Sequence, residues 1–507
     1  MEALPVAAGW AINNLSPQKI LKSIGLGSLL LSLDPIEREL GGRLSKDASI
    51  LLPSAPNFKN ASDRWQNEYK APQISSVVNV KTEEDVQETI RYANEHERPF
   101  IAMAGGHGQT GALSHVRDGI QIDLRAMDQV VISEDGKSAV IGGGAKVKKV
   151  VDELWAFGKE TVTGICECVG IAAPMLGGGH GWNQGKYGLG IDQLIEARIV
   201  LSNGTAVTAS EKSNPDLFWA IRGAGHNFGI VTEMKYKIYD VDSESTRAFE
   251  FFYFAEDKLE ALYTQANELL KTQPANIVHW SFMVMLPFDS VHINEKQPTL
   301  IYAIVHDGPA SYLKEYATPI RDLGPIHTEA GELSMPALAA IAFMDEGGAG
   351  CARGLTGLRF PIIFDKFDVP AVRKVYNHYD KTLQQYPQFN GSFFLLEQYS
   401  TQAVKAVPDE STAFPHREYD LLLTPYIVYK PDPRMDPIAE TFGRQMREYL
   451  LRGSESPDKL MAYVNYAHGD ESLEALYGWD EWRLEKLRKL KAEWDPLNRM
   501  RWYAPIV

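Results

Sequence analysis

The sequence predicts a two-domain protein of the α+β class, and three observations carry this prediction. The chain has 507 residues, which is enough for two domains with substantial cores. In its first half, strand-like and helix-like segments alternate, and glycine-rich loops follow strands. Beyond about residue 242, strand and helix patterns continue to alternate, but no glycine-rich loop of the phosphate-binding kind occurs there.

The first region begins with a strand, a helix and a second strand. Ser76–Val80 is rich in valine and is typical of a strand. Thr82–Asp85 resembles a capping box, and apolar residues follow it at helical spacing: Val86, Ile90 and Ala93. Pro99–Met103 is a short apolar run that leads directly into a glycine-rich loop. This order indicates a strand–helix–strand unit that ends in a ligand-binding loop.

The remaining elements are predicted from shorter patterns. Strands are expected at 119–124, 139–142, 195–201, 205–208, 251–254, 278–285 and 300–305. Asn203-Gly204 predicts a tight hairpin within the first region. Trp482–Trp494 is expected to form a helix near the end of the chain. We interpret Gly347–Gly354 as a surface connection, with a place beside a substrate entrance as the alternative.

Two glycine-rich loops each carry one nucleophilic side chain. His107 lies in the loop 103–108 and Cys166 in the loop 164–170, and a third glycine-rich loop follows at 177–181. Glycine lets the backbone approach a ligand closely and adopt positive φ, so that N–H groups can converge on a pyrophosphate. A histidine and a cysteine in such loops can each bond to a cofactor held there. The arrangement suggests a flavin that is tethered at two points.

Other nucleotide-binding and metal-binding patterns do not fit. Gly106–Gly111 has the form G-x-G-x-x-G, but only residues 112–118 separate it from the next strand, too few for the crossover helix of a dinucleotide fold. The P-loop pattern is absent. The twelve histidines show no H-x-x-x-H spacing and the cysteines no C-x-x-C spacing, so we expect no metal site.

Charge and cysteine content limit the partners and the cellular location. A net charge of −15 argues against nucleic acid and against anionic membranes. No run reaches the roughly 20 apolar residues of a membrane span. The apolar run Ile24–Leu33 starts late and lacks an obvious cleavage site, so we expect residues 1–60 to be a retained extension. We therefore predict a cytoplasmic protein, with secretion as the alternative.

Only three cysteines occur: Cys166, Cys168 and Cys351. If Cys166 holds a flavin, one disulfide remains possible, between Cys168 and Cys351, and nothing in the sequence favours it. We interpret Cys168 as a small buried thiol. This low cysteine count suits a reducing compartment.

Eight motifs occur in the order that they have in one known family. They lie at 105–108, 164–170, 177–189, 216–223, 227–231, 412–417, 463–466 and 495–498. Among them are Gly-Gly-His-Gly, Gly-x-Cys-x-x-Val-Gly and Gly-Gly-Gly-His-Gly-Trp. On these motifs the sequence resembles the berberine bridge enzyme-like FAD-linked oxidases of the vanillyl-alcohol oxidase superfamily, whose FAD-binding domain is of the PCMH type. The resemblance covers the chain beyond about residue 60.

The resemblance implies a domain plan and a cofactor. It places an FAD-binding domain at 61–241, a substrate domain with an antiparallel sheet at 242–460, and a return to the FAD-binding domain at 461–507. It implies covalent FAD, bonded through its 8α-methyl carbon to His107 and through C6 to Cys166. Val169 stands where valine is typical of members that use O2. Further expected FAD-binding residues are Ala104, Gly105, Gly106, Gly108, Gly164, Gly170, Gly177, Gly178, Gly179, Gly181, Tyr187, Gly188, Leu189, Gly229, Ile230, Val231, Tyr463 and Asn465.

The same resemblance assigns a general base. Tyr466 matches a tyrosine that takes a proton in several relatives, and we expect His468 and Asp470 to tune it. The alternative is a regular strand in which one of Tyr463 and Tyr466 belongs to the core. The strand Leu421–Tyr429 lacks the glutamate of the berberine-type ring closure, which argues against that reaction.

Glu397 and the segment Pro415–Arg417 are interpreted as parts of a structural ion pair between strands.

These observations predict an FAD-dependent oxidase. It would take a hydride from a small organic or specialised-metabolite substrate and pass the electrons to O2, giving H2O2. The alternative is a flavoprotein cyclase or pericyclase in which FAD is largely structural. A non-enzymatic binding protein is the third possibility, and the intact flavin motifs argue against it. The oligomeric state is left open.

Overall fold

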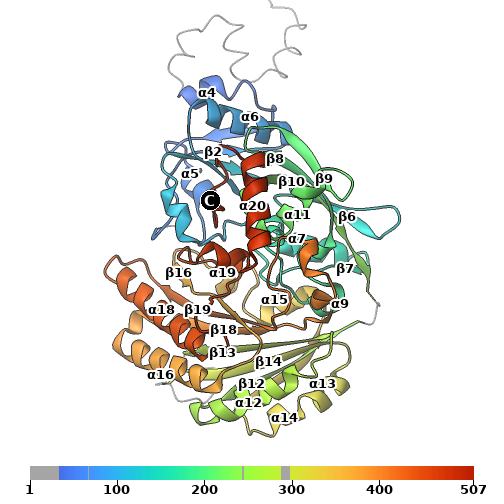
Figure 1. Cartoon of the computed structure of the whole chain (residues 1–507), viewed down its shortest axis with the longest axis vertical. Helices are drawn as coiled ribbons and strands as arrows, with labels where there is room; N and C mark the ends of the chain where they lie inside the picture. The colour runs from blue at the N-terminus through green and yellow to red at the C-terminus, as the bar shows by residue number, and fades with distance from the viewer. Residues whose placement is uncertain (1–33, 67, 242–244, 287–296) are drawn as a thin grey trace, which may run out of the picture.

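The computed structural model describes residues 34–507 except 67, 242–244 and 287–296. Figure 1 shows an upper part, built mostly from the first half of the chain, and a lower part built around one large sheet. The chain returns to the upper part at its end through α19 (Leu473–Tyr477) and α20 (Glu481–Trp494). The expected apolar run Ile24–Leu33 lies outside the described residues.

The first sheet of the upper part has four strands. In spatial order they are β1 (Ser49–Leu51), β2 (Ile74–Asn79), β4 (Gly119–Asp123) and β3 (Phe100–Met103). β2, β4 and β3 are parallel, and β1 pairs antiparallel with β2. The helix α6 (Glu83–Glu95) begins at the predicted capping box, in which Thr82 accepts a hydrogen bond from the Asp85 backbone and the Asp85 carboxylate accepts one from Thr82.

The expected extension 1–60 is described from residue 34, and this part packs with the first sheet. Its described part includes α4 (Pro35–Glu39) and β1, and it leads into α5 (Phe58–Ser62). Ile36 and Leu40 are buried in the same core as the strands of the first sheet. This segment is part of the folded domain because the edge of β2 would otherwise carry unpaired backbone groups.

The second sheet of the upper part has five antiparallel strands. They are β5 (Val130–Ile132), β6 (Ser138–Gly142), β10 (Gly229–Lys237), β8 (Leu194–Leu201) and β9 (Ala206–Ser210). The predicted Asn203-Gly204 hairpin joins β8 to β9, and Gly204 has φ +80°.

Helices cover the core of this second sheet. They are α7 (Val147–Trp155), α8 (Ala172–Leu176), α11 (Pro215–Ala224), α19 and α20. The short helices α9 (Gln184–Tyr187) and α10 (Gly190–Gln193) contact each other, and α10 also contacts α8 and α11. Leu484, Leu487 and Leu490 of α20 pack in the same core as Leu217 and Ile221 of α11. The end of the chain therefore completes the core of the upper part.

The lower part contains the antiparallel sheet that the resemblance predicted, with eight strands among the described residues. Its strands are β15 (His327–Leu333), β12 (Arg247–Phe254), β14 (Thr299–Asp307), β13 (Ile277–Val284), β18 (Phe393–Gln398), β19 (Leu421–Tyr429) and β16 (Thr356–Arg359), with β17 (Ile362–Phe364) also paired to β19. Figure 1 shows α16 (Val369–Gln385) and α18 (Asp436–Gly453) side by side against this sheet.

The two faces of the large sheet have different environments. Phe252 and Phe254 of β12 pack in the core formed with α12 (Leu259–Leu270) and α16, whereas Phe251 and Tyr253 pack on the opposite face. The alternation follows from the period of two along a strand. The opposite face also contacts Trp182 of the upper part, so this face meets the glycine-rich loops.

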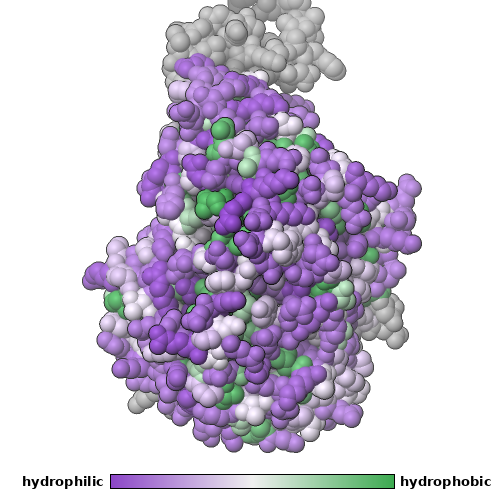
Figure 2. Space-filling model, in the orientation of Figure 1, coloured by the Kyte–Doolittle hydropathy of each residue, from purple (hydrophilic) through white to green (hydrophobic). Residues whose placement is uncertain are grey.

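Smaller elements connect these layers. They are β7 (Lys159–Glu160), β11 (Tyr239–Asp240), α13 (Ala310–Tyr316), α14 (Thr318–Arg321), α15 (Leu338–Ile341), α17 (Gln402–Lys405) and several 3-10 helices, including Gly111–His115 and Val464–Tyr466. The face drawn in Figure 2 is largely hydrophilic, with small separate apolar patches. Within the described residues, no helix has the length and hydropathy needed to cross a bilayer.

Candidate functional site

The loop after β3 packs directly on the loop that carries Cys166. A Cβ on Gly105 would lie 2.5 Å from the carbonyl oxygen of Cys168 and 2.5 Å from the backbone nitrogen of Gly170. A Cβ on Gly170 would lie 2.6 Å from that of Ala104. Only glycine permits this approach, so the two motifs are glycine-rich because they touch each other.

This packing brings His107 and Cys166 together. The ligand atoms of His107, Cys166 and Cys168 all lie within 4.8 Å of one another. His107 Nε2 is buried and has no hydrogen-bond partner among the described residues. Burial, and then the positive charges of Arg353, Arg359 and Lys146, lower the pKa of His107 to about 3. Its imidazole is therefore neutral and keeps a free lone pair, as a nucleophile requires.

Cys166 is the free thiol of the three cysteines, and burial raises its pKa. Its sulfur lies 3.6 Å from the sulfur of Cys168 and 3.9 Å from that of Cys351. His107, Cys166 and Cys168 have the spacing of a metal site, but Cys168 is bonded to Cys351 and offers no thiolate. Two donors remain, fewer than the three or four protein ligands of a zinc site.

The Cys168–Cys351 disulfide corrects two interpretations of the sequence. Cys168 is not a free buried thiol, and Gly347–Gly354 is not a plain surface connection, because the bridge joins this segment to the Cys166 loop. The segment makes further contacts with the upper part: Trp65 Nε1 donates to the Gly350 carbonyl at 3.1 Å, and Arg353 donates to the Gly105 carbonyl at 2.9 Å. This segment of the lower part therefore contacts both the His107 loop and the Cys166 loop.

The third glycine-rich loop packs against the end of the chain. The Tyr463 hydroxyl accepts hydrogen bonds from the backbone N–H of Gly179 at 3.0 Å and of His180 at 3.3 Å. Asn465 donates to the Tyr463 hydroxyl at 2.6 Å, and a Cβ on Gly177 would lie 2.1 Å from the side-chain oxygen of Asn465. Gly178 and Gly179 have φ of +130° and +78°, which favours glycine.

The loops 163–170 and 177–181 also touch each other. A Cβ on Gly181 would lie 2.0 Å from the carbonyl oxygen of Thr163. A Cβ on Gly164 would meet nothing within 4 Å, so this glycine borders open space. A small hollow adjoins it, lined by Gly164, Ile165, Glu167, Trp182, Val151 and Met335 among others.

The remaining expected cofactor residues lie elsewhere in the upper part. Tyr187 stacks on Tyr239 with ring centres 3.6 Å apart, and Gly188 has φ +86° ahead of the buried Leu189. Gly229, Ile230 and Val231 form the start of β10 and pair with β8. The structure thus joins the loops 104–108, 164–170 and 177–181 with Tyr463 and Asn465, whereas Tyr187 and the start of β10 take part in other packing.

Tyr466 contacts a carboxylate that the sequence interpretation did not assign to the site. Its hydroxyl donates to Glu397 Oε1 at 3.4 Å, and the Tyr399 hydroxyl donates to the same oxygen at 2.8 Å. Burial raises the pKa of Glu397 to about 7, although both hydrogen bonds and the charge of Arg359 oppose the rise. Glu397 Oε2 has no partner among the described residues.

The position of Glu397 explains why it was missed. The resemblance places a carboxylate on the strand 421–429, whereas Glu397 lies on the neighbouring β18, opposite Leu422 of β19. The sequence does contain a signal for it: Glu397 directly follows the apolar run Phe393–Leu396, and a carboxylate at the end of a buried strand is unusual. It is not paired with Arg417 as expected, because Arg417 forms its ion pair with Asp192 at 2.7 Å.

Arg359 lies beside the hydrogen-bonded pair of Tyr466 and Glu397, which we call the Tyr466–Glu397 couple. Its guanidinium carbon is 4.4 Å from the ring centre of Tyr466 and 5.0 Å from that of Tyr426. Burial, and then the negative charge of Glu397, raise the pKa of Tyr466 well above its usual value of 10, and Arg359 opposes this rise. The Tyr466 side chain thus lies between a carboxylate and a cation.

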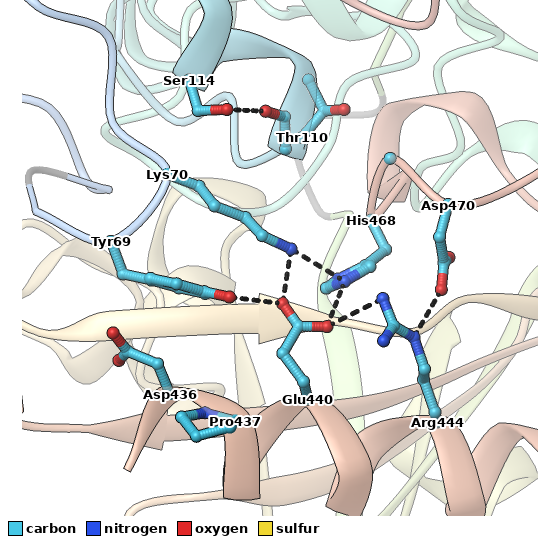
Figure 3. Close-up of polar contacts among 12 residues, drawn as sticks. Tyr69, Lys70, Thr110, Ser114, Asp436, Pro437, Glu440, Arg444, His468 and Asp470 are labelled. Atoms are coloured by element: carbon cyan, nitrogen blue, oxygen red, sulfur yellow. Dashed lines mark hydrogen bonds and ion pairs between the residues drawn. The ribbon is translucent and has the colours of Figure 1, made fainter. Parts of the chain in front are cut away.

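His468 and Asp470 do not have the predicted tuning contacts. Figure 3 shows His468 directed at Glu440 of α18, with Nε2 at 2.9 Å from Glu440 Oε2 and 3.3 Å from Lys70 Nζ. Asp470 accepts hydrogen bonds from Arg444 and Arg447 at 2.8 Å. The segment 464–466 is a 3-10 helix rather than the strand considered above, and the chain leaves it toward α18. His468 and Asp470 are therefore close to Tyr466 in sequence, but their side chains contact other residues.

Aromatic rings line the sheet face next to this couple. Trp182 and Trp280 have ring centres 4.5 Å apart, and His180 stacks on Tyr399 at 6.0 Å. His180 also meets the edge of Tyr463 at 4.7 Å. The face that meets the glycine-rich loops is thus suited to flat organic molecules.

Several buried polar atoms around the loops have no partner among the described residues: His107 Nε2, Gln109 Oε1, Thr163 Oγ1 and Glu397 Oε2. Buried polar atoms in folded proteins are normally satisfied, so a cluster of exceptions marks the place of a bound group. The adjoining glycine-rich loops, together with His107 and Cys166, fit a dinucleotide with a reactive ring.

Comparisons with known proteins agree with this fit. Residues 74–210 match the FAD binding domain family, and residues 462–506 match the family described as berberine and berberine like. The FAD-linked oxidoreductase chyH of Penicillium rubens is 38% identical over 511 residues, which cover 100% of this chain and 99% of that protein.

Solved structures show the same fold. BBE-like 1 of Physcomitrella patens has a TM-score of 0.78 at 22% identity, covering 92% of this chain and 97% of that one. Glucooligosaccharide oxidase of Acremonium strictum, described with a 6-S-cysteinyl, 8α-N1-histidyl FAD, has a TM-score of 0.78 at 20% identity, covering 92% and 98%. The chain therefore belongs to the berberine bridge enzyme-like family of FAD-linked oxidoreductases.

Proposed function

We propose that this FAD-linked oxidoreductase is an oxidase that takes a hydride from a small organic molecule and passes the electrons to O2, giving H2O2. The observation that carries the proposal is the hydrogen bond from Tyr466 to the buried Glu397. The charge of Arg359 acts on this couple and on both His107 and Cys166, so the proton acceptor and the two nucleophiles share one site.

We also propose that FAD is bound covalently through His107 and Cys166. When bound, FAD accepts a hydride at N5 of its ring. The two nucleophiles lie within 4.8 Å of each other, which would let both hold one ring system. The Acremonium strictum oxidase carries a cysteinyl and a histidyl link, which supports the same pair of bonds here.

Tyr466 and Glu397 would together accept the proton that the substrate loses. As the substrate loses a proton from its O–H or N–H, the Tyr466 oxygen accepts it and the Tyr466 hydroxyl proton moves to Glu397 Oε1 along their hydrogen bond. A general base works best when its pKa lies near the working pH, and Glu397, with a pKa of about 7, meets that condition. Arg359 over the Tyr466 ring stabilises the transient negative charge.

The use of O2 rests on Val169. Its carbonyl carbon would lie 3.0 Å from a Cβ on Gly105, so the residue sits at the junction of the two flavin-type loops. The valine side chain is smaller than the leucine that is typical of dehydrogenase members of the family at this position. The smaller side chain supports access of O2.

An anaerobic reaction tests the proposal. Purified holoprotein is mixed without oxygen with a panel of small phenols, alcohols, amines and organic acids, and the flavin absorbance is followed. Bleaching by one class, followed by recovery and peroxide formation when air is admitted, supports the oxidase. Product formation without bleaching supports the cyclase alternative, in which FAD is structural.

The cytoplasmic location remains a prediction. Disulfides are more common in oxidising compartments, so the Cys168–Cys351 bridge supports the alternative of secretion. Mass spectrometry of native protein, blocked with an alkylating agent before extraction, reports both the state of this bridge and the mature N-terminus.

A further inference from the structure

Arg359, the last residue of β16, is a half-buried cation between two tyrosine rings. Its guanidinium carbon lies 4.4 Å from the ring centre of Tyr466 and 5.0 Å from that of Tyr426. Neither ring supplies a negative charge at neutral pH, because burial raises the pKa of Tyr426 to about 12 and that of Tyr466 well above 10. The rings orient the guanidinium but do not neutralise it.

Arg359 differs in this respect from Arg417 and Arg353. Arg417 pairs with Asp192 at 2.7 Å, and Arg353 has Asp63 at 3.8 Å. Within the part of the chain that the structure describes, no carboxylate lies within 4.0 Å of the Arg359 guanidinium. A cation withdrawn from water without an anion is costly, and such a residue marks a place where an anion binds.

Two other cations that act on His107 each have a carboxylate partner. Lys146 and Arg353 also act on His107, but Lys146 has Glu346 at 3.9 Å and Arg353 has Asp63. Glu397 feels the charge of Arg359, yet its Oε1 accepts the hydrogen bonds of Tyr399 and Tyr466 instead. Arg359 is therefore a positive charge next to the proton acceptor that no carboxylate of the described residues contacts.

We propose that Arg359 binds an anionic oxygen of the substrate, so that the substrate is a small organic anion, a carboxylate or an acidic phenol, rather than an amine or a neutral alcohol. This inference rests on the proposed function and names its substrate class. The planar guanidinium fork suits a carboxylate or phenolate, and the rings on either side favour a flat molecule. Bound there, the anion holds the rest of the substrate beside Tyr466.

A binding experiment tests the proposal without turnover. Holoprotein is titrated with benzoate, with its neutral isostere benzamide and with 4-nitrophenolate, and binding is followed by the oxidised flavin spectrum and by calorimetry. We expect benzoate or 4-nitrophenolate to bind at least about tenfold more tightly than benzamide, from the strength of charged hydrogen bonds. The stronger of the two anions identifies a carboxylate or a phenolate as the natural group.

Variants identify the residue responsible. Arg359→Met is expected to weaken anion binding by about 10- to 100-fold and to leave benzamide unchanged, whereas Arg359→Lys falls between. Arg353→Met is the matched control, since its guanidinium also acts on His107 but already has Asp63. We expect it to keep the anion affinity of the native protein. Retained flavin and an unchanged circular dichroism spectrum show that each variant is folded.

Three results would overturn the proposal: binding of both benzoate and 4-nitrophenolate no tighter than that of benzamide, unchanged anion binding in Arg359→Met, or an equal loss in Arg353→Met. An altered flavin reduction potential in Arg359→Met with anion binding intact would assign Arg359 to the flavin instead, and would also overturn it. Because binding is measured on oxidised flavin, a failure to find any bleaching substrate rejects the oxidase function but leaves this result standing.

Discussion

The Tyr466 hydroxyl and Glu397 Oε1 are 3.4 Å apart and join the end of the chain to the middle of the large sheet. Glu397 is only 4% exposed, and its second carboxylate oxygen has no partner among the described residues. Because the pKa of Glu397 is about 7, its buried carboxylate can accept a proton from the Tyr466 hydroxyl near neutral pH.

Removing the Tyr466 hydroxyl should slow the chemistry and leave the fold intact. Tyr466→Phe keeps the ring that stacks under Arg359, so flavin content should match the native protein. Loss of a general base costs about 10²- to 10⁴-fold in rate, and anaerobic stopped-flow measurement of flavin reduction will show it. Tyr399→Phe is the control, since it removes the other donor to Glu397 and should cost far less. Native reduction rates in Tyr466→Phe would place the base elsewhere.

Flavin reduction should depend on the ionisation of Glu397. The pKa of this group is about 7, raised mainly by burial, and only its ionised form accepts the proton from Tyr466. The rate should therefore rise as pH increases through about 7 and level off above it. The groups that face Glu397 are Tyr399, Tyr466 and Arg359. Glu397→Gln should remove this step from the pH profile, and a step that persists in the variant would assign it to another group.

Flavin should remain attached when either nucleophile is removed alone. Both His107 and Cys166 point into the same small region, so His107→Ala and Cys166→Ala should each keep one bond. The double variant should release its flavin on acid precipitation. Absorbance of the pellet and of the supernatant separates the outcomes, and release from the native protein would show that FAD is bound without a covalent link.

The Cys168–Cys351 bridge should stabilise the packing of the segment Gly347–Gly354 on the Cys166 loop. Removing a native disulfide typically costs about 2–5 kcal/mol. Cys351→Ser should therefore lower the thermal midpoint, and a reductant should lower that of the native protein but not that of the variant. Equal midpoints for native and variant protein under oxidising conditions would show that the bridge does not form in solution.

The Glu440 cluster of Figure 3 should support stability and not the chemistry. Glu440 contacts Tyr69, Lys70, Arg444 and His468, and its pKa lies far below the usual 4.5, against the opposing effect of burial. A lowered pKa contributes stability that is present above about pH 4.5 and is lost as pH falls further. Glu440→Gln should cost about 3 kcal/mol in denaturant unfolding at pH 7.

Catalysis gives the contrasting measurement for this cluster. Flavin reduction in folded Glu440→Gln and His468→Gln should match the native rate. A slow His468→Gln variant that keeps native stability would restore the predicted role of His468 as a tuning residue for Tyr466.

The elements set by neighbouring residues could be read from the sequence. The capping box at Thr82 and Asp85 starts α6, and Asn203-Gly204 turns β8 into β9, because each signal acts through backbone geometry within a few residues. The glycine loops of His107 and Cys166 were equally readable, since the absence of side chains there is written in the sequence.

The partners of these residues were decided by the tertiary structure. Tyr466 meets Glu397 across 69 residues and Cys168 meets Cys351 across 183, and such pairs depend on sheet register and on how the two parts pack. His468, two residues from Tyr466, instead reaches Glu440 because the 3-10 helix Val464–Tyr466 redirects the chain. The sequence determined which chemical groups were available, and the packing of distant strands and loops determined which of them meet, because side-chain contact depends on position in space.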